Sequence, residues 1–202
     1  PYTTLFRSHI SGIPGNALGA YLTECDITVY GNAQDAVGDA MNDGTITIHG
    51  NVGDAAGYGM RDGKILVKGS AGYRAGIHMK EYMEKKPLMV IGGKTGDFLA
   101  EYQAGGKIIV LGIGSENTCP VGDFCGTGMH GGVMYIRTEH KPDLPPQVLC
   151  EDADKADLKA IKADVELFAK KFDYDAEKLL DSHFFKLTPN TNNPYRRLYV
   201  NN

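Results

Sequence analysis

Glycine recurs every nineteen residues through the first half of this chain, at Gly19, Gly38, Gly57 and Gly76. A second set keeps the same interval three residues later, and its members are Leu22, Met41, Met60 and Met79. Apolar triplets begin in the same phase at Ile27, Ile46 and Ile65. After two insertions, Gly126 and Met129 return to the pattern. A repeat of this length is typical of a solenoid, in which each unit buries its apolar side against the next.

The composition of each unit favours strands over helices. A unit contains one short run of β-branched residues and several glycines, and no run is long enough for an amphipathic helix. Nineteen extended residues would trace a perimeter of roughly 60 Å, with neighbouring units about 4.8 Å apart. We therefore predict an all-β fold, a parallel β-helix of about 19 residues per coil.

Within this fold the repeated residues have structural roles. We expect the glycines at corners, where the chain takes positive φ or neighbouring coils approach closely. Asn16, Asp35 and Asp54 each precede such a glycine by three residues, and their side chains can bond nearby backbone in turns. The methionine column is expected to pack inside the stack as flexible filler.

Three segments are predicted along the chain. Residues 1–8 begin with proline and resemble a translated sequencing adapter, so we expect them to be a non-native leader. Residues 9–140 form the repeat domain, and residues 141–202 form a helical extension and tail. A helix is expected over 154–172, because Leu158, Ile161, Val165 and Phe168 share one face. We expect this helix to cover the repeat domain, with a free partner-binding helix as the alternative, and a short second helix over 173–182.

Charge and hydropathy exclude several classes of partner. The net charge is −4, with basic residues scattered along the chain, so nucleic acid is not an expected partner. No apolar stretch approaches the length of a membrane span, and no signal peptide is visible, so we predict a cytoplasmic protein without membrane contact. The cysteines lack C-x-x-C spacing and are interpreted as reduced thiols; they are Cys25, Cys119, Cys125 and Cys150.

The sequence contains no motif to which we assign catalysis, cofactor binding or metal binding. Gly126, Gly128 and Gly131 match the spacing of a dinucleotide fingerprint, but a strand pattern follows where that motif needs a helix. His49, His78 and His130 fall on different coils and are expected at the surface or at an interface. Partner contacts are instead expected where insertions leave the stack. The predicted interface residues are Lys80, Glu81, Tyr82, Lys85, Lys86, Gly128 and His130.

Several irregular segments resemble one known domain. Residues 31–38, 41–44 and 126–132 are similar to the Gly-x-Gly-x-Gly domain of the glutamate synthase large subunit, and residues 78–82 and 97–99 resemble its stand-alone form. The resemblance covers residues 9–140 and implies a right-handed β-helix. The β-helix subunit of formylmethanofuran dehydrogenase shares the repeat and is the main alternative.

The resemblance implies a non-catalytic scaffold in an oxidoreductase. Such a scaffold would orient amidotransferase and flavin-containing synthase subunits, which form glutamate from glutamine and 2-oxoglutarate. FMN and iron–sulfur clusters would then be bound by those partners and not by this chain, and self-association into a homo-oligomer stays open. An independent β-helix enzyme or binding protein is the remaining alternative.

Overall fold

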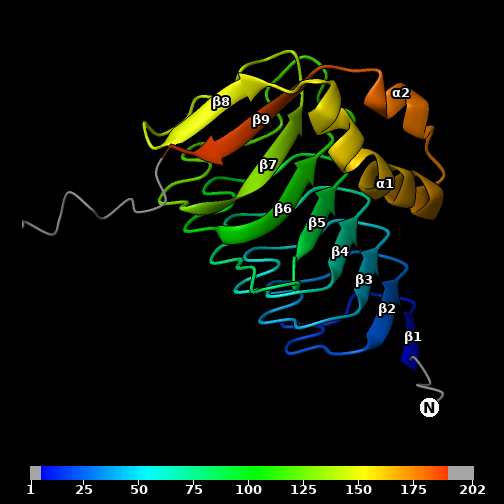
Figure 1. Cartoon of the computed structure of the whole chain (residues 1–202). Coiled ribbons are helices and arrows are strands. Elements are labelled where there is room, and N and C mark those ends of the chain that lie inside the picture. Colours follow the sequence, from blue (N-terminus) through cyan, green and yellow to red (C-terminus); the bar gives the residue numbers. More distant parts are fainter. Residues whose placement is uncertain (1–5, 191–202) are drawn as a thin grey trace, which may run out of the picture.

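A computed structural model describes residues 6–190 of the chain. Its central element is one sheet of nine strands in the order β1-β2-β3-β4-β5-β6-β7-β9-β8 (Figure 1). The strands are β1 (Phe6–Ile10), β2 (Cys25–Val29), β3 (Thr45–Ile48), β4 (Lys64–Val67), β5 (Leu88–Ile91), β6 (Ala104–Val110), β7 (Gly131–Arg137), β8 (Val148–Asp152) and β9 (Phe184–Pro189). The two helices are α1 (Lys155–Phe172) and α2 (Ala176–Leu180).

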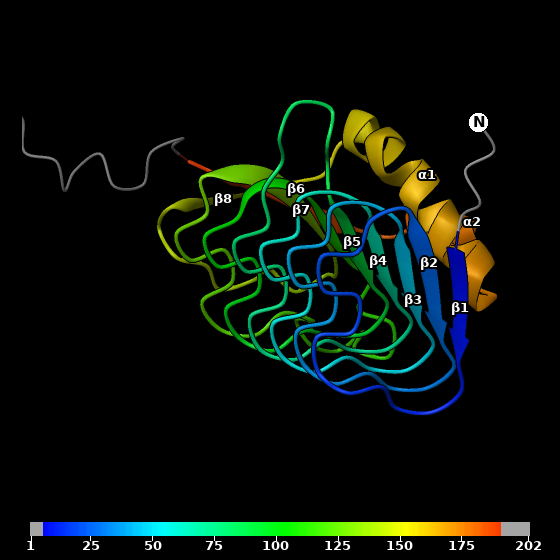
Figure 2. The ribbon, with the colours of Figure 1, turned by 90° about the horizontal axis from the view of Figure 1, so that it is seen from below.

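Strands β1 to β7 are parallel, and the repeat sets their register. Ile27 pairs with Ile46, and Ile46 pairs with Ile65, so each strand sits one repeat beyond its neighbour. The pairing of Lys64 with Leu88 keeps this alignment across the first insertion. Between strands, the chain makes a circuit that stacks on the circuit before it, as Figure 2 shows along the stack.

The parallel strands are buried on both faces, which explains their continuous apolar triplets. On the inner face, Ile46, Ile65 and Ile108 are fully buried within the stack. On the outer face, Leu66 and Val90 pack against α1. The single sheet thus separates two hydrophobic cores.

The remaining part of each repeat unit is turn and not strand. In the second unit, alternate residues Ala36, Gly38 and Ala40 have φ values of 56°, 70° and 50°. Backbone of this kind does not form a β ladder, but its polar groups are still paired between units. The Ala36 N–H donates to Asp54 O at 2.8 Å, and the Gly38 N–H donates to Leu18 O at 2.8 Å.

The predicted fold class, an all-β right-handed parallel β-helix with a C-terminal helical extension, is therefore wrong. The strands form one open, mixed sheet, because β9 pairs antiparallel with both β7 and β8. The other sides of each unit contain alternating left-handed residues where further strands were expected. The physical reason is that the glycine and aspartate positions do not mark short corners between several strands. Outside the one strand, turn residues make up most of each unit.

Helix α1 forms over almost all of its predicted range, which confirms that prediction. Asp154 caps the helix by accepting from the Asp157 N–H, and Asp173 ends it in the left-handed conformation. Ile161, Val165 and Phe168 are buried against the sheet. The helix therefore covers one face of the sheet, as Figure 1 shows, and α2 confirms the shorter predicted helix.

Two predicted segments extend beyond the described residues. Of the predicted leader at 1–8, residues 1–5 lie outside them, while residues 6–8 begin β1 and pair with residues 25–27. The tail from 191 to 202 also lies outside the described part of the chain.

Candidate functional site

The repeated glycines lie in the turns of each unit, on the side that faces the inner core. Gly19, Gly38, Gly57, Gly76 and Gly126 all have φ between 70° and 73°. A Cβ atom added to Gly38 would lie 2.5 Å from Ile65 Cδ1, inside the core. Ala36, in the same turn, also has positive φ, yet alanine is accommodated there. Glycine is thus needed where positive φ coincides with a side chain directed inward.

The second repeated column also lies inside the stack. Met41, Met60, Met79 and Met129 are fully buried, and Leu22, in the first unit, is partly buried against the same core. Gln103 occupies the corresponding place between Met79 and Met129. These residues hold the units together and present no side chain to a partner.

Aspartate and asparagine side chains connect successive units. Asn16 Oδ1 accepts from the Asp35 N–H, Asp35 Oδ1 from the Asp54 N–H and Asp54 Oδ1 from the Tyr73 N–H, at 3.2, 2.9 and 2.8 Å. A parallel row runs from Asn32 through Asn51 to Ser70. The sequence predicted that these side chains bond backbone close to them in the chain. In the structure each side-chain oxygen instead accepts from the backbone N–H one repeat later. These side chains therefore stabilise stacking as well as turning.

The first insertion, residues 80–87, leaves the stack as a tight hairpin. Tyr82 and Lys85 exchange two backbone hydrogen bonds of 3.0 Å each. Met83, at the turn, has φ 55° and is 76% exposed, and Tyr82 is 62% exposed. In Figure 2 the loop in this part of the colour scale extends beyond the other circuits. The hairpin thus carries two large apolar side chains and three lysines into solvent.

The base of the hairpin is fixed to the next unit. Glu81 Oε2 accepts from the Gly106 N–H at 3.0 Å, and Pro87 is buried beside Gly106. Gly105 is closely approached by Glu81, so a side chain at that position would collide with it. Glu81 therefore acts as an anchor for the hairpin, and its carboxylate is already engaged within the chain.

The structure brings the two halves of the predicted interface to one corner of the stack. The Ala104 N–H donates to Met79 O, and the Gly131 N–H donates to Gln103 O, at 2.8 and 3.2 Å. Residues 103–106 therefore lie between the start of the hairpin at Lys80 and the turn at His130, in the unit stacked between them. His130 Nδ1 lies 3.2 Å from Gly128 O, which holds the ring against its own turn.

Gln103 is a residue at this corner whose importance the sequence did not reveal. It is fully buried, and its Nε2 donates to Gly105 O at 3.1 Å and to Gly106 O at 3.3 Å. Its Oε1 has no hydrogen-bond partner among the described residues. The signal in the sequence was a glutamine at a position where other units have methionine. Gln103 holds the backbone of residues 105–106, to which the Glu81 carboxylate is also bonded.

A cavity of about 260 Å³ lies between the hairpin and α1. Lys86 and Pro87 line one side, and Asp164 of α1 lines another. Lys107 crosses this region, with its Nζ 2.8 Å from Asp164 Oδ2 and 2.9 Å from Ala160 O. The hairpin and the helix, considered from sequence as alternative docking elements, are therefore neighbours on one edge.

His49, His78 and His130 lie apart, each against aromatic rings or its own turn. The ring of His49 is stacked on Tyr30, and burial, followed by the charges of Lys68 and Lys171, lowers the pKa of His49. His78 lies between the rings of Tyr58 and Tyr102. Within residues 6–190 no three His, Cys, Asp or Glu side chains are grouped to hold a metal ion. Gly126, Gly128 and Gly131 lead into β7 and not into a helix.

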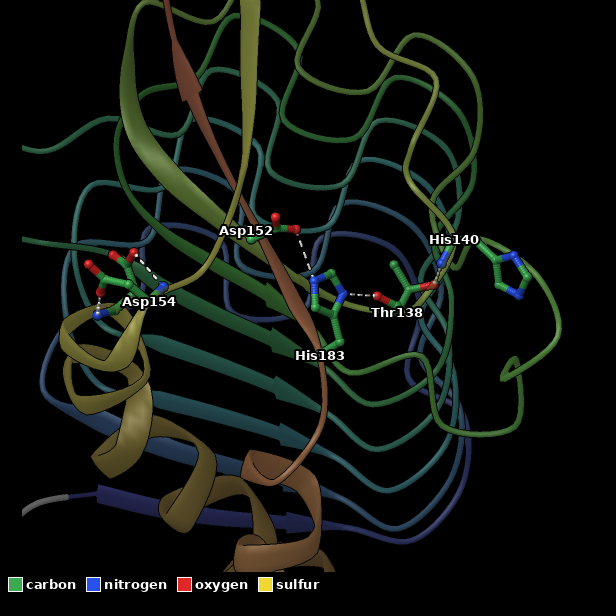
Figure 3. A network of polar contacts seen from close by, with 6 residues as sticks. Thr138, His140, Asp152, Asp154 and His183 are labelled. Atoms are coloured by element: carbon green, nitrogen blue, oxygen red, sulfur yellow. Dashed lines mark hydrogen bonds and ion pairs between the residues drawn. The ribbon is translucent and has the colours of Figure 1, made fainter.

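A fourth histidine, His183, joins the C-terminal strands to the stack. Its Nδ1 lies 2.7 Å from Thr138 O and its Nε2 lies 3.0 Å from Asp152 Oδ1 (Figure 3). Both neighbours are acceptors, so both ring nitrogens can donate only in the imidazolium form. The Thr138 carbonyl contributes most to a raised pKa of His183, burial opposes it, and Asp152 and Glu139 add to it.

His183 also lines a second cavity of about 270 Å³ near the second insertion. Glu116, from that insertion, accepts from the Gly114 N–H at 3.0 Å, and this bond is the largest cause of the lowered pKa of Glu116. Arg137, which also lines this cavity, donates to Leu111 O at 2.8 Å. Glu116 and Arg137 are thus each engaged in a hydrogen bond within the chain.

The four thiols lie in or against the inner hydrophobic core. All four cysteines lie within the described residues and none is in a disulfide. Burial, followed by the neighbouring Cys119 and Cys150, raises the pKa of the Cys125 thiol. A raised thiol pKa disfavours the nucleophilic thiolate.

Neither helix of the described part of the chain has the length and hydrophobicity needed to cross a bilayer.

Comparison with known proteins identifies the family of this chain. The sequence pattern named the GXGXG motif matches residues 3–190. The chain belongs to the GXGXG motif family. An uncharacterized protein of Methanocaldococcus jannaschii is 48% identical over 198 residues, which covers 95% of this chain and 76% of that relative.

Proposed function

We propose that this GXGXG chain is a non-catalytic scaffold subunit of a glutamate synthase-type oxidoreductase. In this role it holds an amidotransferase and a flavin-containing synthase in register, so that ammonia from glutamine reaches 2-oxoglutarate and forms glutamate. The observation that carries the proposal is the family match over residues 3–190, because the GXGXG domain occurs in glutamate synthase.

The arrangement of the chain supports a scaffold. Two hydrophobic cores and the side-chain bonds between units make a continuous stack from β2 to β7. A rigid element can fix the distance and orientation of two bound partners, and positioning of this kind is a large part of catalysis by multi-site enzymes. In the proposed assembly FMN and iron–sulfur clusters are bound by the partners.

The partner edge in this proposal is the hairpin together with the corner at 126–130. Lys80, Tyr82, Lys85, Lys86, Gly128 and His130 are the proposed contact residues, while Glu81 fixes the hairpin internally. Lys85 and Lys86 are exposed and take part in no ion pair formed by residues 6–190. Charges of this kind at an interface rim affect association more than folding.

The test is reconstitution from purified subunits. The chain, an amidotransferase and a flavin-containing synthase from one organism should co-elute, and glutamine-dependent glutamate formation should rise on addition of the chain. A Lys85→Glu, Lys86→Glu variant should melt as the wild type does, since surface changes usually stay within about 0.5 kcal/mol, but it should assemble less. Lys170→Glu, Lys171→Glu on α1 is the charge-matched control. Assembly of the chain with molybdenum or tungsten subunits instead, or glutamate formation that does not depend on it, contradicts the proposal.

A further inference from the structure

Two short rows of rings lie on the outside of the molecule, on the side of the repeat units that the turns form. In one row the ring centroids of Tyr73 and Phe98 are 5.4 Å apart in an edge-on arrangement, and those of Phe98 and Phe124 are 4.9 Å apart and stacked. In the other row His78 meets Tyr58 edge-on and stacks on Tyr102. Phe124 remains 56% exposed. Grouped exposed aromatic side chains of this kind mark binding surfaces in soluble domains.

Folding of the units does not require these rings. Phe98 and Phe124 occupy the left-handed turn position that Ala17, Ala36 and Ala55 occupy in earlier units. The backbone hydrogen bond is the same in both cases, since the N–H of Phe98 donates to Asp123 O as that of Ala36 donates to Asp54 O. Alanine therefore suffices for the turn, and the aromatic side chains serve another purpose.

Carboxylates accompany the rings on the same face. Asp97 and Asp123 directly precede Phe98 and Phe124, and all three of Asp54, Asp97 and Asp123 are exposed. Asp97 Oδ1 accepts from the Asp123 N–H at 2.9 Å, a bond that an asparagine could equally make. None of the ion pairs within residues 6–190 includes these three aspartates. The face therefore combines aromatic rings with negative charge that no basic side chain of the described residues neutralises.

The chain itself shows which group fits such a surface. The guanidinium of Arg74 lies 4.8 Å from the ring centroid of Tyr73 and 5.5 Å from that of Phe98. Its Nε is 2.8 Å from Oε2 of Glu101, which is only 6% exposed. A cation between ring faces and a carboxylate is a favourable arrangement. Arg74 is paired with Glu101. By contrast, no basic side chain of the described residues forms an ion pair with Asp123 or lies over the ring of Phe124.

We infer that this aromatic–aspartate face, formed by Tyr73, Phe98, Phe124, Asp97 and Asp123, docks a partner protein through a segment that presents arginine beside an apolar residue. The arginine stacks on the Phe124 ring and pairs with Asp123 or Asp97, and the apolar residue covers the remaining ring surface. This adds a second docking surface to the scaffold proposed above, but its chemistry does not depend on which enzyme the partner belongs to.

The first measurement uses a fluorescein-labelled peptide, Leu-Arg-Leu-Arg-Leu-Gly, titrated with the whole chain and followed by fluorescence anisotropy. A peptide with glutamate in place of both arginines is the comparison. The arginine peptide should bind at least about tenfold more tightly than the glutamate peptide, a ratio worth about 1.4 kcal/mol. Its affinity should fall when salt is raised from about 0.05 M to about 0.5 M, because exposed charges are screened.

Two variants locate the binding. Asp97→Asn, Asp123→Asn keeps the side-chain acceptors and removes two charges, while Phe124→Ser removes the exposed ring. Both should lose the preference for the arginine peptide, and Asp26→Asn, Asp62→Asn, which removes two charges elsewhere, should keep it. Circular dichroism checks that each variant is folded.

Equal binding of both peptides, or an unchanged preference in the two variants, overturns the inference. Concentration-dependent dimerisation that Phe124→Ser abolishes also overturns it, because a second copy would then occupy the face. Failure of the enzyme reconstitution alone, with the peptide results as expected, contradicts the proposed function and leaves this surface assigned.

Discussion

Gly38→Ala should destabilise the protein by about 2–5 kcal/mol. Two costs add at this position. Hydrogen bonds to Leu18 and Met41 hold the backbone of residue 38 at φ 70°, where a residue with a Cβ atom costs about 1–2 kcal/mol. It also places a Cβ 2.5 Å from Ile65 Cδ1, and Ile65 is fully buried. Overpacking of a filled core costs about 1–3 kcal/mol.

Two substitutions in similar turns separate these costs. Gly59 has φ 57°, but a Cβ there would meet no atom within 4 Å, so Gly59→Ala measures the backbone cost alone. Ala36→Gly removes a left-handed alanine at φ 56° and should change stability by no more than about 1 kcal/mol, since relief of strain is offset by backbone entropy.

Urea denaturation followed by circular dichroism gives the free energy of unfolding and the m value of each variant. The expected order of stability is Ala36→Gly close to wild type, then Gly59→Ala, then Gly38→Ala. If Gly38→Ala and Gly59→Ala unfold at the same urea concentration, the inward direction of the side chain is irrelevant, and the explanation given for the repeated glycines is wrong.

Three further predictions concern the core, the bonds between units and pH. Met60→Ala should cost about 2–5 kcal/mol by calorimetry, because Met60 is fully buried in the column; an unchanged melting temperature would show that the column does not support the stack. Asp54→Asn should keep wild-type stability, whereas Asp54→Ala should lose about 0.5–1.5 kcal/mol with its bond to the Tyr73 N–H. The pKa of His183 is raised in the folded state, so its contribution is complete below its unfolded pKa of about 6.5 and is lost as pH rises through the folded pKa. The difference in unfolding free energy between wild type and His183→Asn should therefore shrink from about pH 6 to about pH 9, and a difference independent of pH would contradict the doubly bonded imidazolium.

The spacing of the repeat was enough to predict the strand alignment. Ile27, Ile46 and Ile65 were recognisable as equivalent because one interval separates them, and they pair in the sheet. The same phase identified Met60 as a column residue, and the apolar face of residues 154–172 predicted α1. Periodic patterns of this kind report local geometry directly, which is why they could be read from one chain.

The turns could not be predicted in the same way. Ala36, Ala40 and Ala55 adopt positive φ although nothing in their side chains favours it. Their N–H groups donate to carbonyl oxygens of the next unit, and these hydrogen bonds hold them in that conformation. The antiparallel pairing of β8 with β9 was also missed, since 31 residues separate His183 from Asp152 and no periodicity links the two strands. The anchoring role of Glu81 was missed for a similar reason, because its bond to Gly106 depends on a contact across units.

The side-chain bonds between units imply that the chain can be lengthened without loss of alignment. The interval between bonded residues is 19 from Asp35 to Asp54, 24 from Ser70 to Lys94 and 26 from Asp97 to Asp123. Extra residues loop out between two bonded positions, and the rows of bonds continue on either side of them. Each unit of this chain therefore lengthens the stack by one strand spacing, about 4.8 Å. Adding or removing one whole unit would change the separation of two partners bound at different heights by one such step, and the length of a projecting loop could evolve independently of that distance.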